Sequence, residues 1–447
     1  MQRRRTLALL SVGLFLVVAL AGCGQQAAAP APAPQPSVQP TPAPQPDKLV
    51  IWTQKNFVAA VNDQFQKIAD DFGKAKNVKV EVSFLSFQDL PNKLAAAVEG
   101  KSLPDISIVE TPGAAALYQK AGIVEDVTDL VKSFGKPLPL VEESTKIGDK
   151  YYSLITSVVA IPLQYRKDYF QAAGISKPPE TWDELAADAR QLTDVGKDRF
   201  GLALSLGKSN DAESMIRPIL WSYGGREFSP DGTRATVNSP ETVAAIKFLA
   251  QLFKDGVPPG AVGWDLTGDN KSYESGEAAM NMNTGTIIAK AMGQSGDHKL
   301  GENTGAALPP SGPGGRNTFA YVDTYVVFKG NGSQLAKEFF KFLYQRDTYV
   351  AFLKSFGGFN LPGYEGFIAD NDAYYTEDPR RGTFRQIAQY AHTVGWPGPT
   401  NAAANEIYNR GLLTDMVQKV LVQKVSPEQA AAEAQKAYQD VIDAYRK

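Results

Sequence analysis

The chain has 447 residues, of which 43% are hydrophobic and 21% charged, a composition typical of globular protein long enough for two or more cores. Its formal net charge of −2 argues against a nucleic-acid-binding surface. The sequence contains one cysteine, so it offers no pair for an internal disulfide.

The first 22 residues have the organisation of a secretory signal peptide. Three arginines at positions 3–5 precede the apolar run TLALLSVGLFLVVAL, which is shorter than the roughly 18–20 residues of a transmembrane helix. The run ends in Leu20-Ala21-Gly22-Cys23, which resembles a bacterial lipobox. In proteins with that motif the chain is cut before the cysteine and the cysteine sulfur is lipidated. We therefore expect export, a net charge of −5 after cleavage, and a lipid anchor at Cys23 on the outer face of the cytoplasmic membrane.

Residues 23–47 form the predicted tether. Eight prolines between positions 30 and 46 prevent a helix and a hydrophobic core, so this stretch is expected to be an extended spacer. At about 3.1 Å per residue it would hold a domain on the order of 50 Å from the membrane.

The folded part begins with alternating strand and helix patterns. Leu49 to Trp52 form a short apolar strand candidate, and Val58 to Phe72 carry apolar residues at helical spacing. The segment VKVEVSFL (78–85) has the alternating pattern of a strand, and a helix is expected around 90–99. The segment PDISIVE is a third strand candidate, which ends at Glu110. This β-α-β-α-β order predicts a largely parallel sheet covered by helices, with ligands held at the carboxyl ends of its strands.

Beyond residue 150 the pattern changes. Residues 149–175 are apolar and aromatic, as in a continuous pair of strands. Thr181 and Glu184 have the spacing of a capping box at a helix start. Further helices are predicted over 240–254, 334–346, 402–424 and 427–446, and the Gly/Pro-rich segment 308–316 is expected to be a crossing or hinge.

Together these segments resemble the extracellular solute-binding proteins of family 1, the sugar-binding subunits of ABC importers. The most specific stretch is VVAIPLQYRKDYFQAAGISKPPETWDEL, and LPDISIVETPGAAALYQKAGIVEDVTDLV, YESGEAAMNMNTGT, ALPPSGPGG and SPEQAAAEAQKAY are similar to further family elements in the same order. The resemblance extends over nearly all of residues 48–447.

The resemblance implies an α/β fold of the two-lobe, type II periplasmic-binding-protein kind, with a hinge of about three crossings. One lobe would hold residues 48–156 and 309–328, and the other 161–304 and 333–447. A solute would bind between the lobes, which would close on it, and pass to the ABC permease. We expect a monomer without catalytic residues, metal or cofactor.

A sugar needs aromatic rings for its C–H faces and polar groups for its hydroxyl rim. Trp52 ends the first strand, while Trp221, Tyr223, Trp264 and Trp396 lie in predicted loops or strand ends. Each of these aromatics can equally be an ordinary core or rim residue. The polar candidates are Glu110, Thr111, Asp265 and Asn360.

One position departs from the resemblance. Many sugar-binding members carry a stacking tryptophan shortly after the GEAAM element, and this chain has Thr286 there. The same fold with a polyamine or a phosphate ester as its ligand therefore remains an alternative.

A membrane-anchored hydrolase is the alternative from another class. Ser205 and Lys208 match Ser-x-x-Lys, but the companion motifs of serine acyl-enzymes are missing. The two histidines, His298 and His392, are far apart in the sequence and poorly supply a catalytic triad or a zinc site. Glycoside hydrolysis by a pair of carboxylates remains an alternative, because the distance between two carboxylates is not visible in a sequence.

Overall fold

The computed structural model describes residues 47–109, 111–294, 296–368 and 372–446. The predicted signal peptide, the lipidation site Cys23, nearly all of the tether and the candidate Glu110 lie outside these ranges. Within them, no helix combines the length and the apolar character that a bilayer span requires.

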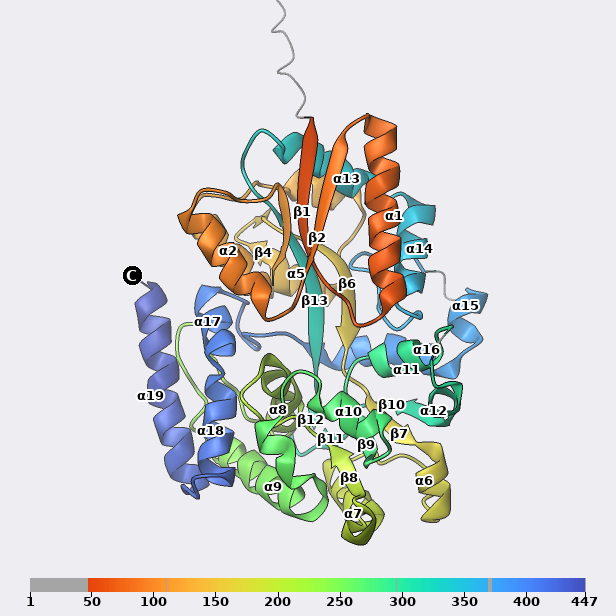
Figure 1. Cartoon of the computed structure of the whole chain (residues 1–447). Coiled ribbons are helices and arrows are strands. Elements are labelled where there is room, and N and C mark those ends of the chain that lie inside the picture. Colours follow the sequence, from red (N-terminus) through yellow and green to blue (C-terminus); the bar gives the residue numbers. More distant parts are fainter. Residues whose placement is uncertain (1–46, 110, 295, 369–371, 447) are drawn as a thin grey trace, which may run out of the picture. The chain divides into compact units, whose positions relative to one another are not determined.

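The first sheet defines lobe 1, the upper half of the folded part in Figure 1. Its first three strands pair in parallel, as the β-α-β-α-β pattern predicts. A long strand from much later in the chain, β13, then adds antiparallel to β3 and to β6. In the order β14-β13-β3-β1-β2, with β6 beside β13, the strands are β1 (Lys48–Gln54), β2 (Lys79–Leu85), β3 (Ile106–Val109), β6 (Leu154–Ala160), β13 (Thr318–Val327) and β14 (Ala391–His392).

Helices cover this sheet and close the core of lobe 1. In α1, Val61, Phe65 and Phe72 are buried at the predicted helical spacing, and Phe65 packs against rings from β2, β13 and two further helices. The helices with side chains in this core include α1 (Ala59–Lys76), α2 (Asp89–Glu99), α3 (Pro112–Lys120), α4 (Thr128–Ser133), α13 (Ser333–Leu343), α14 (Arg346–Ser355) and α16 (Pro379–Ile387).

The second sheet defines lobe 2, the lower half of the folded part in Figure 1. Its order is β10-β7-β9-β8, with β8 parallel to β9 and the other pairs antiparallel. The strands are β7 (Leu163–Arg166), β8 (Phe200–Ala203), β9 (Ala278–Met282) and β10 (Thr304–Ala307). The helices of its core are α6 (Lys167–Ala172), α7 (Trp182–Leu192), α8 (Asn210–Ser222), α9 (Pro240–Gly256), α17 (Ala402–Arg410), α18 (Leu412–Leu421) and α19 (Pro427–Arg446).

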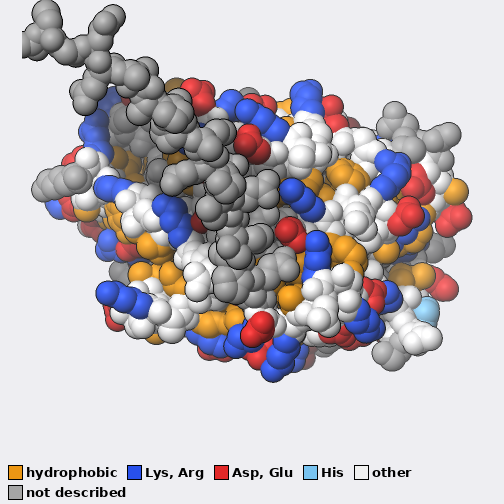
Figure 2. Space-filling view, turned by 90° about the horizontal axis from the view of Figure 1, so that it is seen from above, with side chains coloured by type: hydrophobic (Ala, Val, Ile, Leu, Met, Phe, Trp, Pro, Cys, Tyr) orange, Lys and Arg blue, Asp and Glu red, His pale blue; other side chains and the backbone are white. Residues whose placement is uncertain are grey.

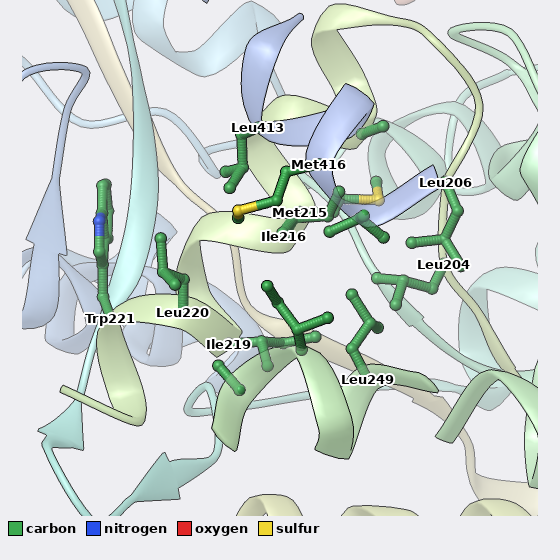
Figure 3. Close-up of a cluster of buried hydrophobic side chains, with 14 of the residues drawn as sticks. Leu204, Leu206, Met215, Ile216, Ile219, Leu220, Trp221, Leu249, Leu413 and Met416 are labelled. Atoms are coloured by element: carbon green, nitrogen blue, oxygen red, sulfur yellow. The ribbon is translucent and has the colours of Figure 1, made fainter. Parts of the chain in front are cut away.

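Helix α8 lies at the centre of the lobe 2 core, and nearly its whole length is buried. Figure 3 shows its apolar side chains meeting those of the strand β8 exit, α9 and α18. The labelled members of this cluster are Leu204, Leu206, Met215, Ile216, Ile219, Leu220, Trp221, Leu249, Leu413 and Met416. The N-terminal end of α8 faces lobe 1, where Asp211 accepts a hydrogen bond from Tyr321 of β13.

Within the described residues, the chain crosses between the two sheets at 161–162, 308–317 and 393–401. The second of these segments contains the short hairpin of β11 (Ser311–Gly312) and β12 (Gly315–Arg316). The remaining short elements lie around the two lobes and their junction: β4 (Lys146–Ile147), β5 (Lys150–Tyr151), α5 (Pro139–Thr145), α10 (Gly268–Glu274), α11 (Thr286–Ala291), α12 (His298–Asn303) and α15 (Ala373–Thr376).

Several predicted helix starts are confirmed by their caps. Thr181 and Glu184 form both bonds of the capping box, and the Ser239 side chain accepts the Thr242 N–H ahead of Pro240. Helix α19 has the predicted bounds, 427–446. These starts depend on side chains a few residues apart, so the sequence alone identifies them.

Three local predictions differ from the structure. The predicted helix 402–424 is divided at Gly411, whose positive φ of 68° ends α17 and begins α18. The expected strand pair of 149–175 does not form, since β6 and β7 belong to different sheets. Residues 333–364 and helix α16, assigned from sequence to the second lobe, pack in lobe 1, because side chains such as Phe339, Phe359 and Phe384 fit into its core.

The described surface of lobe 1 carries both signs of charge. Figure 2 shows Lys and Arg side chains interspersed with Asp and Glu over the described part of this face. Many of these groups form exposed ion pairs, such as Lys67 with Asp71 and Lys48 with Glu81. Exposed pairs of this kind contribute little to stability.

Lobe 2 contains a cluster of charged side chains that, unlike the surface ion pairs, is buried. Arg217 of α8 is fully buried and donates to both carboxylate oxygens of Glu227, at 2.8 Å each. It also pairs with Glu213 at 3.0 Å, and Tyr438 of α19 donates to Glu227 at 2.9 Å. The cluster joins α8 to the C-terminal helix, and its charges are compensated only while all members are present.

We predict that Arg217→Met destabilises the protein by about 3–5 kcal/mol, because two buried carboxylates lose their cation. Urea denaturation followed by circular dichroism measures this change. The control is Arg190→Met, which breaks the exposed pair with Asp255 and should cost less than about 1 kcal/mol. Equal costs for the two variants would contradict a structural role of the cluster.

Candidate functional site

A cavity lies at the junction of the two lobes, with an empty volume of about 1050 Å³ that includes its opening to solvent. Lobe 1 contributes the carboxyl ends of β1 and β3 and the middle of β13, where parallel sheets commonly hold ligands. Its lining residues are Gln54, Asn56, Phe57, Phe87, Leu90, Ile108, Val109, Val159, Tyr321, Val322, Asp323, Phe356 and Asn360. Lobe 2 contributes Asn210, Asp211, Leu266, Asn270, Asn283, Thr284 and Thr286.

On the lobe 2 side, the turn after β9 presents a row of amide and hydroxyl groups. Asn283 donates to Asp269 at 2.6 Å and to Asn270 at 2.9 Å, while its own oxygen accepts the Thr284 N–H at 2.6 Å. Behind the turn, the buried Gln164 donates to the carbonyls of Asn283 and Thr284. These bonds hold the turn in one conformation, so its polar groups are positioned before any ligand arrives.

Two buried carboxyl groups lie beside this turn. Asp211 in the first turn of α8 and Asp269 in α10 hydrogen bond to each other, and Asp211 also accepts from the Tyr321 hydroxyl at 3.3 Å. Burial raises the pKa of both groups, and the charge of Asp269 raises that of Asp211 well above its usual range. Both carboxyls are therefore harder to ionise than exposed ones, and Asp211 more so than Asp269.

On the lobe 1 side, a polar chain runs from β13 towards the loop after α14. The Ser157 hydroxyl donates to Asp323, and the Asn360 amide donates to the Ser157 oxygen at 2.9 Å. Burial raises the pKa of Asp323 to about 6. Asp323 and Asn360 thus present one polar wall to the cavity, opposite the wall of Asn283 and Thr284.

Three phenylalanines provide the apolar part of the lining. Phe57 follows β1 in a loop that is fixed by hydrogen bonds between Asn56 and Asn62, and Phe87 follows β2. Phe356 is the third ring, at the end of α14. Among the described lining residues there is no lysine, arginine or histidine, so the charged groups of the cavity are carboxyls.

Among the binding residues predicted from sequence, Asn360 is the one that lies in the described lining of this cavity. Thr286, which stands where a stacking tryptophan was expected from the resemblance, also lines it, and its hydroxyl is 3.2 Å from that of Thr284. Glu110 follows the lining residue Val109 but lies outside the described residues.

Two of the nominated tryptophans form an aromatic cluster inside lobe 2 instead. Trp221 is fully buried, and Trp396 packs against it at 5.4 Å between ring centroids. Trp396 also stacks on His392 at 3.8 Å and lies under the Arg226 guanidinium. Burial and the charge of Arg226 lower the pKa of His392 to about 4, so this imidazole is neutral. Tyr223 packs nearby against Phe248.

The other nominated residues also lie outside the lining. Trp264 and Asp265 border a separate surface hollow on lobe 2, and Trp52 packs on lobe 1 beneath the ammonium of Lys93. The Thr111 hydroxyl donates to Asn405 of α17 at 2.5 Å, a contact between the lobes. Large apolar rings bury more area inside a core than at a cavity wall, which is why tryptophan content alone misplaced the site.

Sequence reasoning missed Phe57 and Phe87, although both have a usable signal. Each is an aromatic residue two or three positions after the end of a parallel strand, where a ligand-facing loop begins. Phe57 is also 54% exposed, which is unusual for such a large apolar side chain.

The residues of the hydrolase alternative have other partners. Lys208 pairs with Asp415 at 3.1 Å, and the buried Ser205 hydroxyl lies 3.4 Å from the Asp265 carbonyl. His298 begins α12, and His392 belongs to the aromatic cluster described above. In the part of the chain that the structure describes, no group of three or more His, Cys, Asp or Glu residues could hold a metal ion.

The family model of the bacterial extracellular solute-binding proteins matches residues 59–349, more than half of the chain. The chain belongs to this family. Among relatives of this solute-binding protein, a binding protein of Brucella abortus is 24% identical over 368 residues, which cover 79% of the present chain and 86% of the relative. The sn-glycerol-3-phosphate-binding periplasmic protein UgpB of Agrobacterium fabrum is 25% identical over 397 residues, 84% of this chain and 87% of that one.

Solved structures agree on the fold. An ABC transporter solute-binding protein from Thermotoga lettingae, bound with α-D-tagatose, superposes with a TM-score of 0.79 at 20% identity and covers 89% of this chain and all of that one. The predicted two-lobe α/β fold of a periplasmic binding protein is therefore confirmed. Membership of an extracellular family also implies that the solute-binding protein is exported.

The partly buried carboxyl of Asp323 predicts a pH effect on stability. Its pKa is higher in the folded protein than in the unfolded chain, so the folded state binds the proton more tightly. The stabilisation of the folded state by this proton is lost as pH rises from about 4 through about 6. We predict that Asp323→Asn gains thermal stability over the parent protein as pH rises across this window. Melting curves of both proteins from pH 4 to 7.5 measure this difference in thermal stability. The lowered pKa of His392 makes stability rise with pH, but this effect is the same in both proteins and cancels in the difference. A difference that does not change with pH would contradict the burial of Asp323.

Proposed function

We propose that this solute-binding protein binds a sugar or oligosaccharide in the cavity between its lobes and delivers it unchanged to an ABC permease. The observation that carries the proposal is the composition of the cavity lining. Amides and hydroxyls from both lobes surround a space that three phenylalanine rings border, without a cation among the described lining residues. A ligand that contacts both lobes binds the closed arrangement better and shifts the population towards it.

The lining suits a neutral, hydroxylated ligand. Sugar C–H faces pack on aromatic rings such as Phe57, and their hydroxyls must find polar partners because an unpaired buried hydroxyl costs about 1–3 kcal/mol. Side-chain amides such as Asn283 and Asn360 can donate and accept, as can threonine hydroxyls.

A phosphate ester is disfavoured by the same lining. The relative UgpB is named for binding glycerol 3-phosphate, but a phosphate in this cavity would lie near Asp323 and the Asp211–Asp269 pair. Arginine, lysine or clustered backbone N–H groups would be needed to offset that repulsion. A phosphate ester therefore fits the charge of this cavity less well than a sugar does.

A polyamine is the second candidate, and the carboxyls of the cavity favour it. Two acidic residues, Asp211 and Asp323, line the described part of the cavity, and phenylalanine rings attract cations. The raised pKa values of Asp211, Asp269 and Asp323 reduce the negative charge beside the cavity, however. A neutral ligand therefore suits this lining better than a polycation.

The proposed location is the outer face of the bacterial cytoplasmic membrane. Support comes from the lipobox-like Leu20-Ala21-Gly22-Cys23 after an apolar signal and from the proline-rich stretch that follows it. Anchored through Cys23, a monomeric receptor on an extended tether would stay in water and still reach its permease.

A thermal-shift and calorimetry screen tests the proposed ligand class. We expect at least one saccharide to stabilise the protein, by about 2.7 kcal/mol at 100 times its Kd, while phosphate esters and polyamines give no shift. Chromatography of the recovered ligand should show it intact. Stabilisation by a polyamine alone would replace the sugar proposal by the second candidate, and cleaved saccharide would favour the hydrolase.

Two cavity variants test the location of the site. Asn210 lies at the start of α8, and Asn360 lies opposite on lobe 1. We predict that Asn210→Ala and Asn360→Ala each weaken saccharide binding by about tenfold, because each removes an amide from a ligand hydroxyl. Calorimetry measures the affinities. Trp264→Phe, on the separate hollow of lobe 2, is the control and should bind as the parent does; the reverse pattern would move the site to that hollow.

A further inference from the structure

Four buried side-chain oxygens of lobe 2 have no hydrogen-bond donor among the described residues. They are Asp211 Oδ2, Asp269 Oδ1, Asn281 Oδ1 and Gln164 Oε1. Gln164, Asp269 and Asn281 are fully buried, and Asp211 is 9% exposed. Buried polar atoms of native proteins nearly always have a partner, so four neighbouring oxygens without one need a physical explanation.

Strand pairing and helix packing bring these side chains together behind the wall of the cavity. Gln164 of β7 and Asn281 of β9 lie opposite each other on neighbouring strands. Helix α10 lies against β9, where the Asn281 amide donates to the Asp269 carbonyl at 3.2 Å and hydrogen bonds to its carboxyl. Asp269 in turn contacts Asp211. Since the nitrogen and the oxygen of one amide are bonded to the same carbon, the unpartnered Asn281 oxygen stays close to both carboxyls.

The orientation of both amides is fixed by the bonds that their nitrogens donate. Gln164 Nε2 donates to the carbonyls of Asn283 and Thr284, at 3.0 Å and 2.7 Å. Exchanging nitrogen and oxygen in Gln164 would turn its oxygen towards these two carbonyls, and in Asn281 towards the Asp269 carbonyl. The unpartnered atoms are therefore acceptors, and they need a donor or a cation from outside the set.

The Asp211–Asp269 pair differs from the other buried acids of lobe 2. Glu213 and Glu227 share the buried cation Arg217. In the described part of the chain, neither Asp211 nor Asp269 forms an ion pair with a lysine, an arginine or a histidine. Two buried carboxylates side by side need a proton or a cation. A proton between them would leave both amide oxygens without a partner, whereas one cation can be bound by all four oxygens.

We propose that these four oxygens bind one metal cation, and that Ca²⁺ is the ion that fits them best. Ca²⁺ is held by carboxylate and amide oxygens in flexible arrangements, whereas Mg²⁺ keeps several of its waters and demands a stricter geometry. The set contains no sulfur or imidazole, the ligands that favour zinc. The Ser205 hydroxyl, which hydrogen bonds to Asp211, offers a further oxygen.

The proposed site adds a metal to a protein that the sequence predicted to have none. It contains two acids, so it differs from a cluster of three or more His, Cys, Asp or Glu residues, which the described residues lack. The two carboxylates balance the charge of Ca²⁺. Asn283 donates to Asp269 and lines the cavity, so the ion also holds the lobe 2 wall of the cavity in place. This inference does not depend on which solute the protein binds.

Counting the bound ion in the parent protein tests the site directly. Protein freed of metal with a chelator is incubated with Ca²⁺, separated from free ion and measured by elemental mass spectrometry. We expect one Ca²⁺ per chain and a melting temperature that rises with Ca²⁺ concentration, with little response to Mg²⁺. No bound Ca²⁺ and an unchanged melting temperature at millimolar Ca²⁺ would overturn the proposal and leave a shared proton and buried water as the partners of these oxygens.

Variants test the location of the ion. Asp211→Asn and Asp269→Asn should each weaken Ca²⁺ binding about 100-fold, because each removes a charged ligand. Asn281→Ala should weaken it about tenfold; it leaves both carboxyls in place and keeps the test decisive if circular dichroism shows that an aspartate variant is unfolded. Asp265→Asn, an exposed carboxylate just before α10, is the matched control and should bind within about twofold of the parent. Unchanged Ca²⁺ affinity in the folded variants of the set would place the ion elsewhere and overturn the proposal, while the proposed solute binding would stand.

Discussion

The site depends on one strand that belongs to both lobes. Strand β13 begins with Phe319 in the core of lobe 2 and ends with Tyr325 to Val327 in the core of lobe 1. Its middle, Tyr321 to Asp323, lies between the two cores and lines the cavity. The middle is held by its pairing with β6 and by Val322, which packs with Val158 in a further small core. The side chains of Tyr321 and Asp323 are thereby positioned at the cavity between the lobes.

The buried carboxyls give the cavity its chemical character. Asp211 and Asp269 come from lobe 2, and Asp211 is bonded to Tyr321 of β13. The same cluster of groups thus connects the lobes and borders the ligand space. Burial raises the pKa of Asp211 and Asp269, and a protonated carboxyl can donate a hydrogen bond whereas an ionised carboxylate can only accept. Carboxyls beside the cavity oppose a phosphate ester and are compatible with a neutral ligand.

Phe57 shows how the loop after a strand can present an exposed side chain to the cavity. Phe57 follows β1 in a loop whose backbone is fixed by Asn56 and Asn62, so its exposed ring is presented at a defined position. Fixing the loop in advance lowers the entropy that a ligand would lose in ordering it.

The sequence determined the features that depend on neighbours in the chain. Helix periodicity, the Thr181–Glu184 capping box and the parallel β-α-β-α-β order all use residues a few positions apart, and the structure contains them. Only the tertiary structure decided which aromatic residues face the cavity, because Trp221 and Phe57 look equally suitable in sequence and differ by the packing around them. It also decided that α13 and α14 join lobe 1 and that Asp211 meets Asp269, since these contacts join residues far apart in the chain. Burial and pairing across such distances carry no local signal, and they are what makes the site.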